Sequence, residues 1–352
     1  MIISRKNLAV LLVLAILVCT LAGCKSQPQA SDLPSISDAS DVVNPFQQDE
    51  VNTGAINGIS HGPRNPNLDE NERLMPLVFS GDDIRCEYYV NASGQAKNVG
   101  FLMFVNGIPQ PYKIDETGAS YEYMHIFELK EDNVETPFTF IFSPVTGKQG
   151  ESLKVIVVSI YNPSFAPDMD KTTSFGGYHA ILPASYSLQF ETDASFDEEI
   201  ASSIFGTATL STELVTNQLL ETISNNGMRD VDMDIFNSEI FNLIYFDGEM
   251  QTDNLNVPDS GTLQVKYMLC GHAGLAYETT FYLNHQPIAS TEGISNYAVV
   301  EKGAISVITF DIELDKLGDF NTFYVVSVPK NSSDFPNGIF EPTKTQSILL
   351  HK

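Results

Sequence analysis

Short runs of β-branched and aromatic residues dominate the chain after residue 76 and constrain its fold most strongly. In the first half they span residues 84–90, 99–105, 121–129, 138–142, 153–161 and 186–190. Turn-forming clusters such as Asn91-Ala92-Ser93-Gly94 separate them. Strands that recur about every 10 to 18 residues, with no helical crossover between them, predict an antiparallel sandwich or barrel rather than βαβ units.

The second half of the chain repeats the first. Residues 101–109 recur at residues 280–288, and each copy is a hydrophobic strand running into an asparagine-initiated turn with a proline. Val-Val-Ser-Ile at residues 157–160 returns as Val-Val-Ser-Val at residues 325–328. Two further landmarks agree, residues 88–90 with 266–268 and residues 181–188 with 340–348. Recurrence in the same order indicates a duplicated structural unit.

The repeat predicts an all-β chain with two tandem immunoglobulin-like antiparallel β-sandwich domains. We expect the first at residues 76–192 and the second at residues 229–352, and we expect each to fold as its own unit. Residues 193–228 form the linker between them.

The linker contains the one helical signal in the sequence. Leu214, Leu220 and Ile223 belong to an apolar set near helical spacing, Thr212 or Ser211 is placed to cap its start, and residue 227 is a glycine. The polar face of this helix brings together no acid, base or metal ligand, which favours a packing or spacer helix.

The first 24 residues have the features of an export signal. Arg5 and Lys6 precede twelve uninterrupted apolar residues at positions 8–19. A helix needs about 20 apolar residues to cross a bilayer, so this segment is too short for a permanent span. The next residues are Thr20, Leu21, Ala22, Gly23 and Cys24.

Leu21-Ala22-Gly23-Cys24 resembles the lipobox of bacterial lipoprotein precursors, and all four positions match. The resemblance implies that the Cys24 thiol receives a diacylglyceryl group and that residues 1–23 are removed as a signal peptide. It also implies that the new N-terminus is often acylated, and two or more acyl chains give a stable anchor. The expected location is the cell membrane, with the protein facing outside the cytoplasm.

Residues 24–75 are rich in Ser, Pro, Asp, Asn, Gln and Gly, and they predict a lipidated cysteine followed by a disordered, flexible tether. Within it, Gly58-Ile59-Ser60-His61-Gly62 matches the nucleophile-elbow pattern of hydrolases. No apolar strand precedes this motif, and Pro63 and Pro66 break any helix after it. We interpret the match as chance.

The charge of the chain excludes one class of partner. It has 19 Lys and Arg against 45 Asp and Glu, a formal net charge of −26. Nucleic-acid binding needs basic surface, so no nucleic-acid partner is expected. An acidic protein is also repelled by an anionic membrane, so attachment is expected through the lipid on Cys24.

Cysteine and acidic residues give no further site. Cys86 and Cys270 fall at non-equivalent positions of the two repeats, which predicts two unpaired, mostly buried thiols. Asp230-Val231-Asp232-Met233-Asp234 starts like a calcium loop, but Ile235 and Phe241 occupy the positions that require Gly and Glu. Its alternation predicts a half-buried strand. Asp168 and Asp170, beside a proline-rich loop, could help to hold a calcium ion, but two carboxylates are too few to predict a site.

No catalytic, cofactor or metal residue is predicted. The six histidines have no metal-ligand spacing, and no nucleophile, base and orienting acid can be grouped. The favoured function is a lipid-anchored cell-envelope protein that is a non-catalytic binding or scaffolding module on the outer face of the membrane, with a protein or glycan ligand. The alternatives are an extracytoplasmic enzyme with an unrecognised site and the solute-binding component of a transporter.

Overall fold

A computed structural model describes residues 58–94, 96–163, 181–196, 204–251, 254–290, 293–335 and 340–352. Residues from Gly54 to Lys352 form one compact unit. Cys24 and the signal segment lie outside the described residues. Within the described ranges, no helix is long and apolar enough to cross a membrane.

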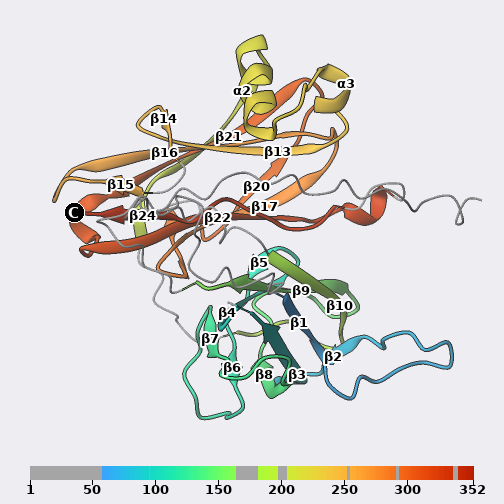
Figure 1. The fold of residues 1–352 in the computed structure, drawn as a ribbon. Coiled ribbons are helices and arrows are strands. Elements are labelled where there is room, and N and C mark those ends of the chain that lie inside the picture. The colour runs from blue at the N-terminus through green and yellow to red at the C-terminus, as the bar shows by residue number, and fades with distance from the viewer. Residues whose placement is uncertain are drawn as a thin grey trace, which may run out of the picture. The chain divides into compact units, whose positions relative to one another are not determined.

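The first sandwich consists of two sheets (Figure 1). One has the order β1 (Gly58–Pro63), β3 (Ile84–Ser93), β8 (Thr136–Phe142) and β6 (Lys113–Ile114). The other has the order β2 (Leu77–Phe79), β10 (Ile181–Phe190), β9 (Ser152–Tyr161), β4 (Asn98–Val105) and β5 (Ile108–Pro109), with β7 (His125–Glu128) also on β4. All these pairs are antiparallel except β2 with β10.

The second sandwich has the same plan. One sheet has the order β12 (Ala208–Leu214), β21 (Ala304–Glu313), β16 (Thr262–Gly271), β13 (Ile240–Phe246) and β14 (Glu249–Met250). The other has the order β15 (Asn254–Asn256), β24 (Ile348–His351), β22 (Phe320–Pro329), β17 (Ala276–Leu283) and β18 (Gln286–Pro287). In this second sheet β20 (Asn296–Val299) pairs with β17 and β23 (Thr343–Lys344) with β22, while β11 (Ile204–Gly206) pairs with β19 (Ala289–Ser290).

Helices are few and short. The helices α2 (Asn217–Gly227) and α3 (Met233–Phe236) cover the outer face of the sheet that contains β13 and β16 (Figure 1). Two 3₁₀ turns span Leu314–Lys316 and Ser332–Asp334. The chain therefore has an all-β fold with a small helical cover on the second sandwich.

The duplication predicted from the sequence is confirmed by strand order. β4 and β9 lie side by side in the first sandwich as β17 and β22 do in the second. β2 and β15 each add in parallel to the last strand of their own sandwich. Both sandwiches are immunoglobulin-like in this arrangement of two packed, mainly antiparallel sheets.

The asparagine landmark of the repeat marks a two-residue hairpin. Asn106 and Gly107 have φ angles of 52° and 84°, and Asn284 and His285 have φ angles of 49° and 67°. Two consecutive residues in the left-handed backbone region form a turn whose twist matches that of the antiparallel strands it joins. Asn adopts this conformation readily. Each hairpin returns the chain from the central strand, β4 or β17, to the edge.

The central strands are buried on both faces. All eight residues of β17 are buried, as are seven of the eight in β4. Within the second sandwich Phe281 packs on Phe310 of the opposite sheet. The next side chain, Tyr282, belongs instead to a cluster shared by both sandwiches. That shared cluster contains Leu102, Phe104, Met124, Ile156, Val158 and Ile160 from the first, and Tyr282, Tyr324, Val326 and Val328 from the second.

Two basic side chains lie beside the shared cluster, the buried Lys344 and the half-buried His285. Lys344 Nζ donates to Thr345 O at 3.0 Å and to Ser347 Oγ at 2.9 Å, and it lies 4.5 Å from the centre of the Tyr324 ring. Burial lowers the pKa of Lys344 to about 7. Burial, and then the nearby Lys344, lower the pKa of His285 to about 4. Both groups therefore favour their neutral forms in the folded state.

The structure corrects the extent of the expected tether. Gly58–Pro63 form strand β1, which pairs with β3 along its whole length. His61 Nδ1 lies 2.8 Å from Tyr88 Oη, His61 Nε2 lies 2.9 Å from Leu182 O, and the ring packs edge-on against Phe101. Because this segment is rich in Gly and Ser, its composition did not indicate a strand. The strand is covered by residues that are distant in the sequence. Ser60 is exposed on this strand, so the motif forms no nucleophile elbow.

The expected linker also belongs largely to the second sandwich. The helix is confirmed as α2, but Thr216 caps it, and the expected caps Ser211 and Thr212 lie in β12. β12 pairs with β21, and Leu219 and Ile223 of α2 pack on the same sheet. The copies are therefore better bounded near residues 58 and 204 than near 76 and 229. Whether each copy folds alone stays a prediction.

Cys86 and Cys270 are unpaired and lie in different sandwiches. Burial raises the pKa of the Cys86 thiol to about 11 and that of Cys270 to about 12. Both thiols are therefore protonated and unreactive near neutral pH.

We predict that His61→Ala in residues 25–352 lowers the free energy of unfolding by about 1 to 3 kcal/mol, because it removes the ring packed on Phe101 and its hydrogen bonds to Tyr88 Oη and Leu182 O. His125→Ala is the control, since the His125 ring forms its hydrogen bond with Glu122 in a half-exposed pair. Urea denaturation measures both. Equal, small effects would contradict the place of β1 in the core.

We predict that stability rises with pH between about 7 and 10 because of Lys344. Its folded pKa of about 7 lies below the unfolded value of 10.5, so the unfolded chain binds the extra proton in this window. The expected gain is about 3 to 5 kcal/mol across the window. Denaturation at several pH values should show that Lys344→Met removes this rise, whereas Lys148→Met, at an exposed position, retains it. If stability changed with pH in the same way for the parent chain and both variants, the result would contradict a buried Lys344 that is neutral in the folded state.

Candidate functional site

The only site residue predicted from the sequence, Cys24, lies outside the described residues, and its lipidation stays a prediction. Asp168 and Asp170, the weaker calcium candidates, also lie outside them. The search for a site in the folded body therefore rests on the acidic run, the histidines and the surface hollows.

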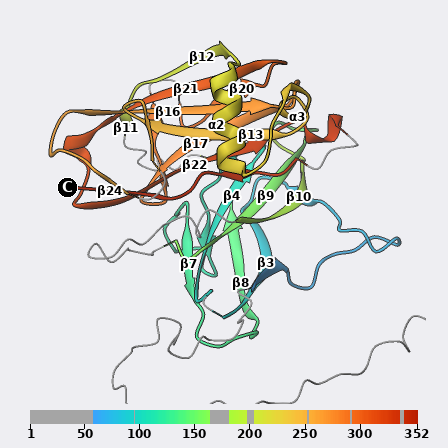
Figure 2. The same cartoon turned by 45° about the horizontal axis from the view of Figure 1, so that its top comes forward.

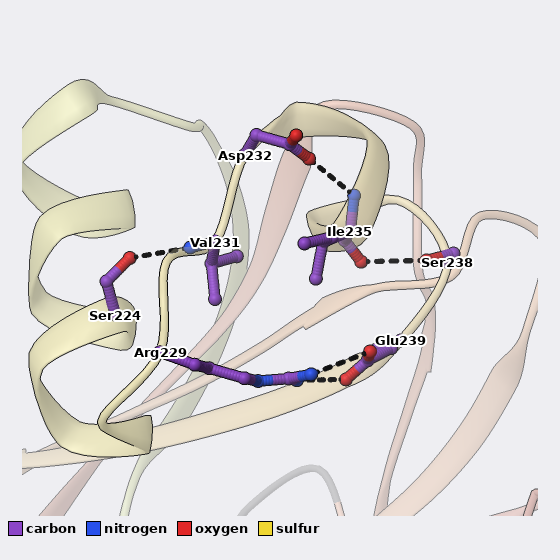
Figure 3. Close-up of polar contacts among 7 residues, drawn as sticks. All are labelled: Ser224, Arg229, Val231, Asp232, Ile235, Ser238 and Glu239. Atoms are coloured by element: carbon purple, nitrogen blue, oxygen red, sulfur yellow. Dashed lines mark hydrogen bonds and ion pairs between the residues drawn. The ribbon is translucent and has the colours of Figure 1, made fainter.

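The acidic run at residues 230–234 does not form the expected half-buried strand. It forms a loop that leads into α3, and the Asp232 carboxylate accepts hydrogen bonds from the backbone N–H groups of Asp234 at 3.0 Å and Ile235 at 2.9 Å. Figure 3 shows this N-cap beside the loop. An aspartate that can cap a helix favours a helix start over a strand. The alternation of acidic and apolar residues does not show which of the two will form.

The rest of this loop is held by its own side chains (Figure 3). Val231 N donates to Ser224 Oγ at 2.9 Å, and Arg229 pairs with Glu239 through two hydrogen bonds. Each acidic side chain that forms a hydrogen bond in this loop accepts it from backbone N–H groups or from an arginine. Among the described residues no three His, Cys, Asp or Glu side chains gather as metal ligands.

The histidines lie apart from one another. His125 Nδ1 is 2.7 Å from Glu122, His272 packs between the rings of Phe335 and Phe340, and His285 lies against Tyr324. His351 Nδ1 is 3.3 Å from Asn256 Nδ2, and His179 lies outside the described residues. Together with His61 on β1, these contacts place the described histidines in separate structural roles.

The best candidate site is a pocket at the margin of the second sandwich, which we call the amide pocket. Its lining is made of Asn226, Asn242, Leu243, Ile244, Met250, Gln251, Thr345 and Gln346, and its volume is about 270 Å³. Half of these residues are carboxamides and none is ionisable. In a chain with 45 acidic residues, a hollow free of charge is a distinctive chemical environment.

Both sheets and the helical cover contribute to the amide pocket. Asn226 comes from the last turn of α2, residues 242–244 from β13, and Met250 from β14. Thr345 and Gln346 lie in the connection between β23 and β24 of the other sheet. Thr345 is held by backbone bonds to Val325, from N to O at 2.9 Å and from Val325 N to Thr345 Oγ1 at 3.0 Å.

Most of the carboxamides are available to a ligand. Asn226 Nδ2 contacts Met250 Sδ at 3.4 Å. The side-chain amides of Asn242, Gln251 and Gln346 form no hydrogen bond with any other described residue. A carboxamide both donates and accepts hydrogen bonds, and the aliphatic wall contributes apolar contact. The amide pocket can therefore recognise an uncharged polar group, but it holds no group that moves a proton or attacks a substrate.

A second hollow, of about 420 Å³, lies on the first sandwich beside the loop that follows β1. Its charged lining residues are Arg64, Arg85 and Glu87. Arg64 pairs with Glu135 at 3.1 Å, Arg85 donates to a backbone carbonyl, and Glu87 accepts from Asn65 at 3.1 Å. These partners already occupy the charged groups, so this hollow is a weaker candidate than the amide pocket.

Sequence reasoning missed the amide pocket because no local pattern marks it. Its residues come from segments as far apart as residues 226 and 346, and each carboxamide by itself is an ordinary polar residue. Only the packing of α2, β13 and the β23–β24 connection brings them together.

Comparison with known proteins adds little to this description. No family model matches the chain, and no curated protein matches it. The solved structures that are similar include "BspA_C_WT", at 10% identity and a TM-score of 0.21, which covers 82% of this chain and 99% of that chain.

Two further similar structures contain adhesion proteins by their titles. The chaperone–tip adhesion subunit complex CsuC–CsuE of Acinetobacter baumannii has 10% identity and a TM-score of 0.18, covering 83% of this chain and 98% of that chain. Collagen adhesin from S. aureus has 6% identity and a TM-score of 0.16, covering 85% of this chain and 93% of that chain. TM-scores this low assign no function, so the fold rests on the sheet topology of the chain itself.

Proposed function

We propose that this chain is a lipid-anchored protein of the cell envelope that acts as a non-catalytic binding module on the outer face of the membrane. The observation that carries the binding part is the amide pocket, a hollow with free hydrogen-bonding carboxamides and no ionisable group. The sequence Leu21-Ala22-Gly23-Cys24 supports the anchor.

The chemistry of the amide pocket favours recognition over reaction. General acid–base or nucleophilic catalysis needs a group that exchanges a proton or forms a bond, and carboxamides do neither at neutral pH. The ligand we propose presents hydroxyl or amide groups without charge, as a neutral glycan or an extended protein segment does. An anionic ligand meets no cationic side chain in the lining of this pocket and is repelled by the net charge of the chain.

The amide pocket is tested by removing its hydrogen-bonding groups. We predict that Asn242→Leu and Gln346→Leu each weaken retention of the ligand found on arrays of neutral glycans and envelope proteins by about tenfold, the effect of one lost hydrogen bond. Gln189→Leu, at an exposed position on β10, is the matched control and should bind normally. Equal binding by all four chains would exclude the amide pocket as the site.

The same chains also test the enzyme alternative. Residues 25–352 should show no turnover on ester, peptide, glycoside or phosphoester panels. Reproducible turnover that one buried Asp, Glu or His substitution abolishes would replace the binding proposal with an enzymatic one.

The anchor is tested at a single atom, the sulfur of Cys24. We predict that Cys24→Ser, expressed in a bacterial host, loses labelled palmitate and keeps its signal segment, because a hydroxyl does not replace the thiolate in acylation. Cys86→Ser, which changes a half-buried thiol of the folded body, should retain the label. Labelled palmitate on the Cys24→Ser chain would contradict the lipobox assignment.

A further inference from the structure

Strand β12 leaves a long sheet edge open. It is an end strand of its sheet, and its seven residues pair with β21 on one side only (Figure 2). In the described part of the chain no strand pairs with its other side. An open edge presents a row of backbone N–H and C=O groups that readily add another strand.

The other end strands are short or interrupted, and β2 and β14 cover the longer strands β10 and β13 only in part. The end strands β2, β5, β6, β14, β15 and β18 have only two or three residues each. β1 has six residues, but two are glycines, the last is Pro63, and the His61 ring bonds to Leu182 O beside it. Short strands and prolines protect sheet edges from pairing with other chains. β12 lacks both protections.

β12 also exposes two leucines on one face. Its register with β21 pairs Leu210 with Ile308 and Ala208 with Phe310, and both of those β21 residues lie in the second core. Leu210 and Leu214 therefore point to the same face, but they are 53% and 80% exposed. Thr212 lies between them on that face.

We propose that β12 pairs with β12 of a second copy of this chain, antiparallel and about a two-fold axis through Thr212. That register places Leu210 of each copy opposite Leu214 of the other, and the two copies of Thr212 face each other. Directly opposite residues on one face of an antiparallel pair are in contact, so all four exposed leucines become cross-strand pairs. The pattern Leu-Ser-Thr-Glu-Leu at residues 210–214 is self-complementary in this sense.

The charge on β12 is compatible with pairing between two acidic chains. Glu213 is its only ionisable residue, and it accepts from Lys266 Nζ at 2.8 Å and 3.1 Å. In the proposed register Glu213 faces Ser211 of the other copy, so no like charges are opposite. The remaining repulsion comes from the net charge of −26 and is long-ranged, so salt should strengthen the dimer.

The contact is small, which sets the expected strength. One seven-residue ladder buries less than the roughly 1,600 Å² of a standard interface, so we expect a micromolar dissociation constant. This inference is independent of the proposed ligand, since β12 does not line the amide pocket.

Sedimentation of residues 25–352 tests the dimer between about 1 and 300 μM, at about 20 and 300 mM salt. We expect a monomer–dimer equilibrium that tightens with salt. Leu210→Lys should weaken it at least tenfold, whereas Leu68→Lys, at a 47% exposed leucine of the first sandwich, should leave it unchanged. Monomers under every condition, or equal loss in both variants, would overturn the proposal. Matching thermal melts would show that both variants fold.

A cysteine scan tests the register. Under mild oxidation Thr212→Cys should give a disulfide-linked dimer, since the two-fold axis brings the two introduced thiols together. Ser211→Cys is the matched control, because Ser211 faces Glu213 of the other copy, and the parent chain shows whether Cys86 and Cys270 contribute. Cross-linking of Ser211→Cys in preference to Thr212→Cys would overturn the two-fold axis at Thr212.

Discussion

Burial of the central strands on both faces is the constraint on which the rest of this structure depends. β4 and β17 turn one face to the opposite sheet of their own sandwich and the other to the cluster that both sandwiches share. In the sequence such strands are continuous runs of apolar residues. Because both of their faces are covered, they leave no surface for a ligand. The sheet edges, the loops and the helical cover remain accessible, and the amide pocket and the open edge of β12 lie there.

The same burial determines how charge is distributed. Lys344 is buried and His285 is half-buried, so desolvation favours their neutral forms, and the Lys344 amine donates hydrogen bonds to Thr345 O and Ser347 Oγ. Most of the described acidic residues remain at the surface, where they cap backbone groups or pair with single cations, as Asp232 and Glu239 do, whereas the buried Glu278 pairs with Lys330. The proposed ligand of the second sandwich would thus meet a neutral pocket on an acidic body, which favours selection by hydrogen bonding over attraction by charge.

Predictions from local sequence patterns were wrong where a segment could form either a strand or a helix, or where its structure depended on residues distant in the sequence. The Gly/Ser-rich segment of β1 has no apolar periodicity, and it is a strand because His61 reaches Tyr88 and Leu182. The alternating acidic run at residues 230–234 could form either a strand or a capped helix. Because Val231 and Phe236 pack against α2, the helix is favoured. The amide pocket had no signal at all, because carboxamides acquire a role only when other segments approach them.

The sequence by itself determined the strand-rich class, the duplication and the Asn106 and Asn284 hairpins, since these follow from apolar periodicity and from the dihedral angles each residue accepts. It also predicted α2 and the unpaired cysteines. Only the tertiary structure decided which strands end the sheets, which segments belong to each sandwich and which side chains share a pocket. Those features depend on pairing between residues far apart in the chain, and local propensities do not encode such pairing.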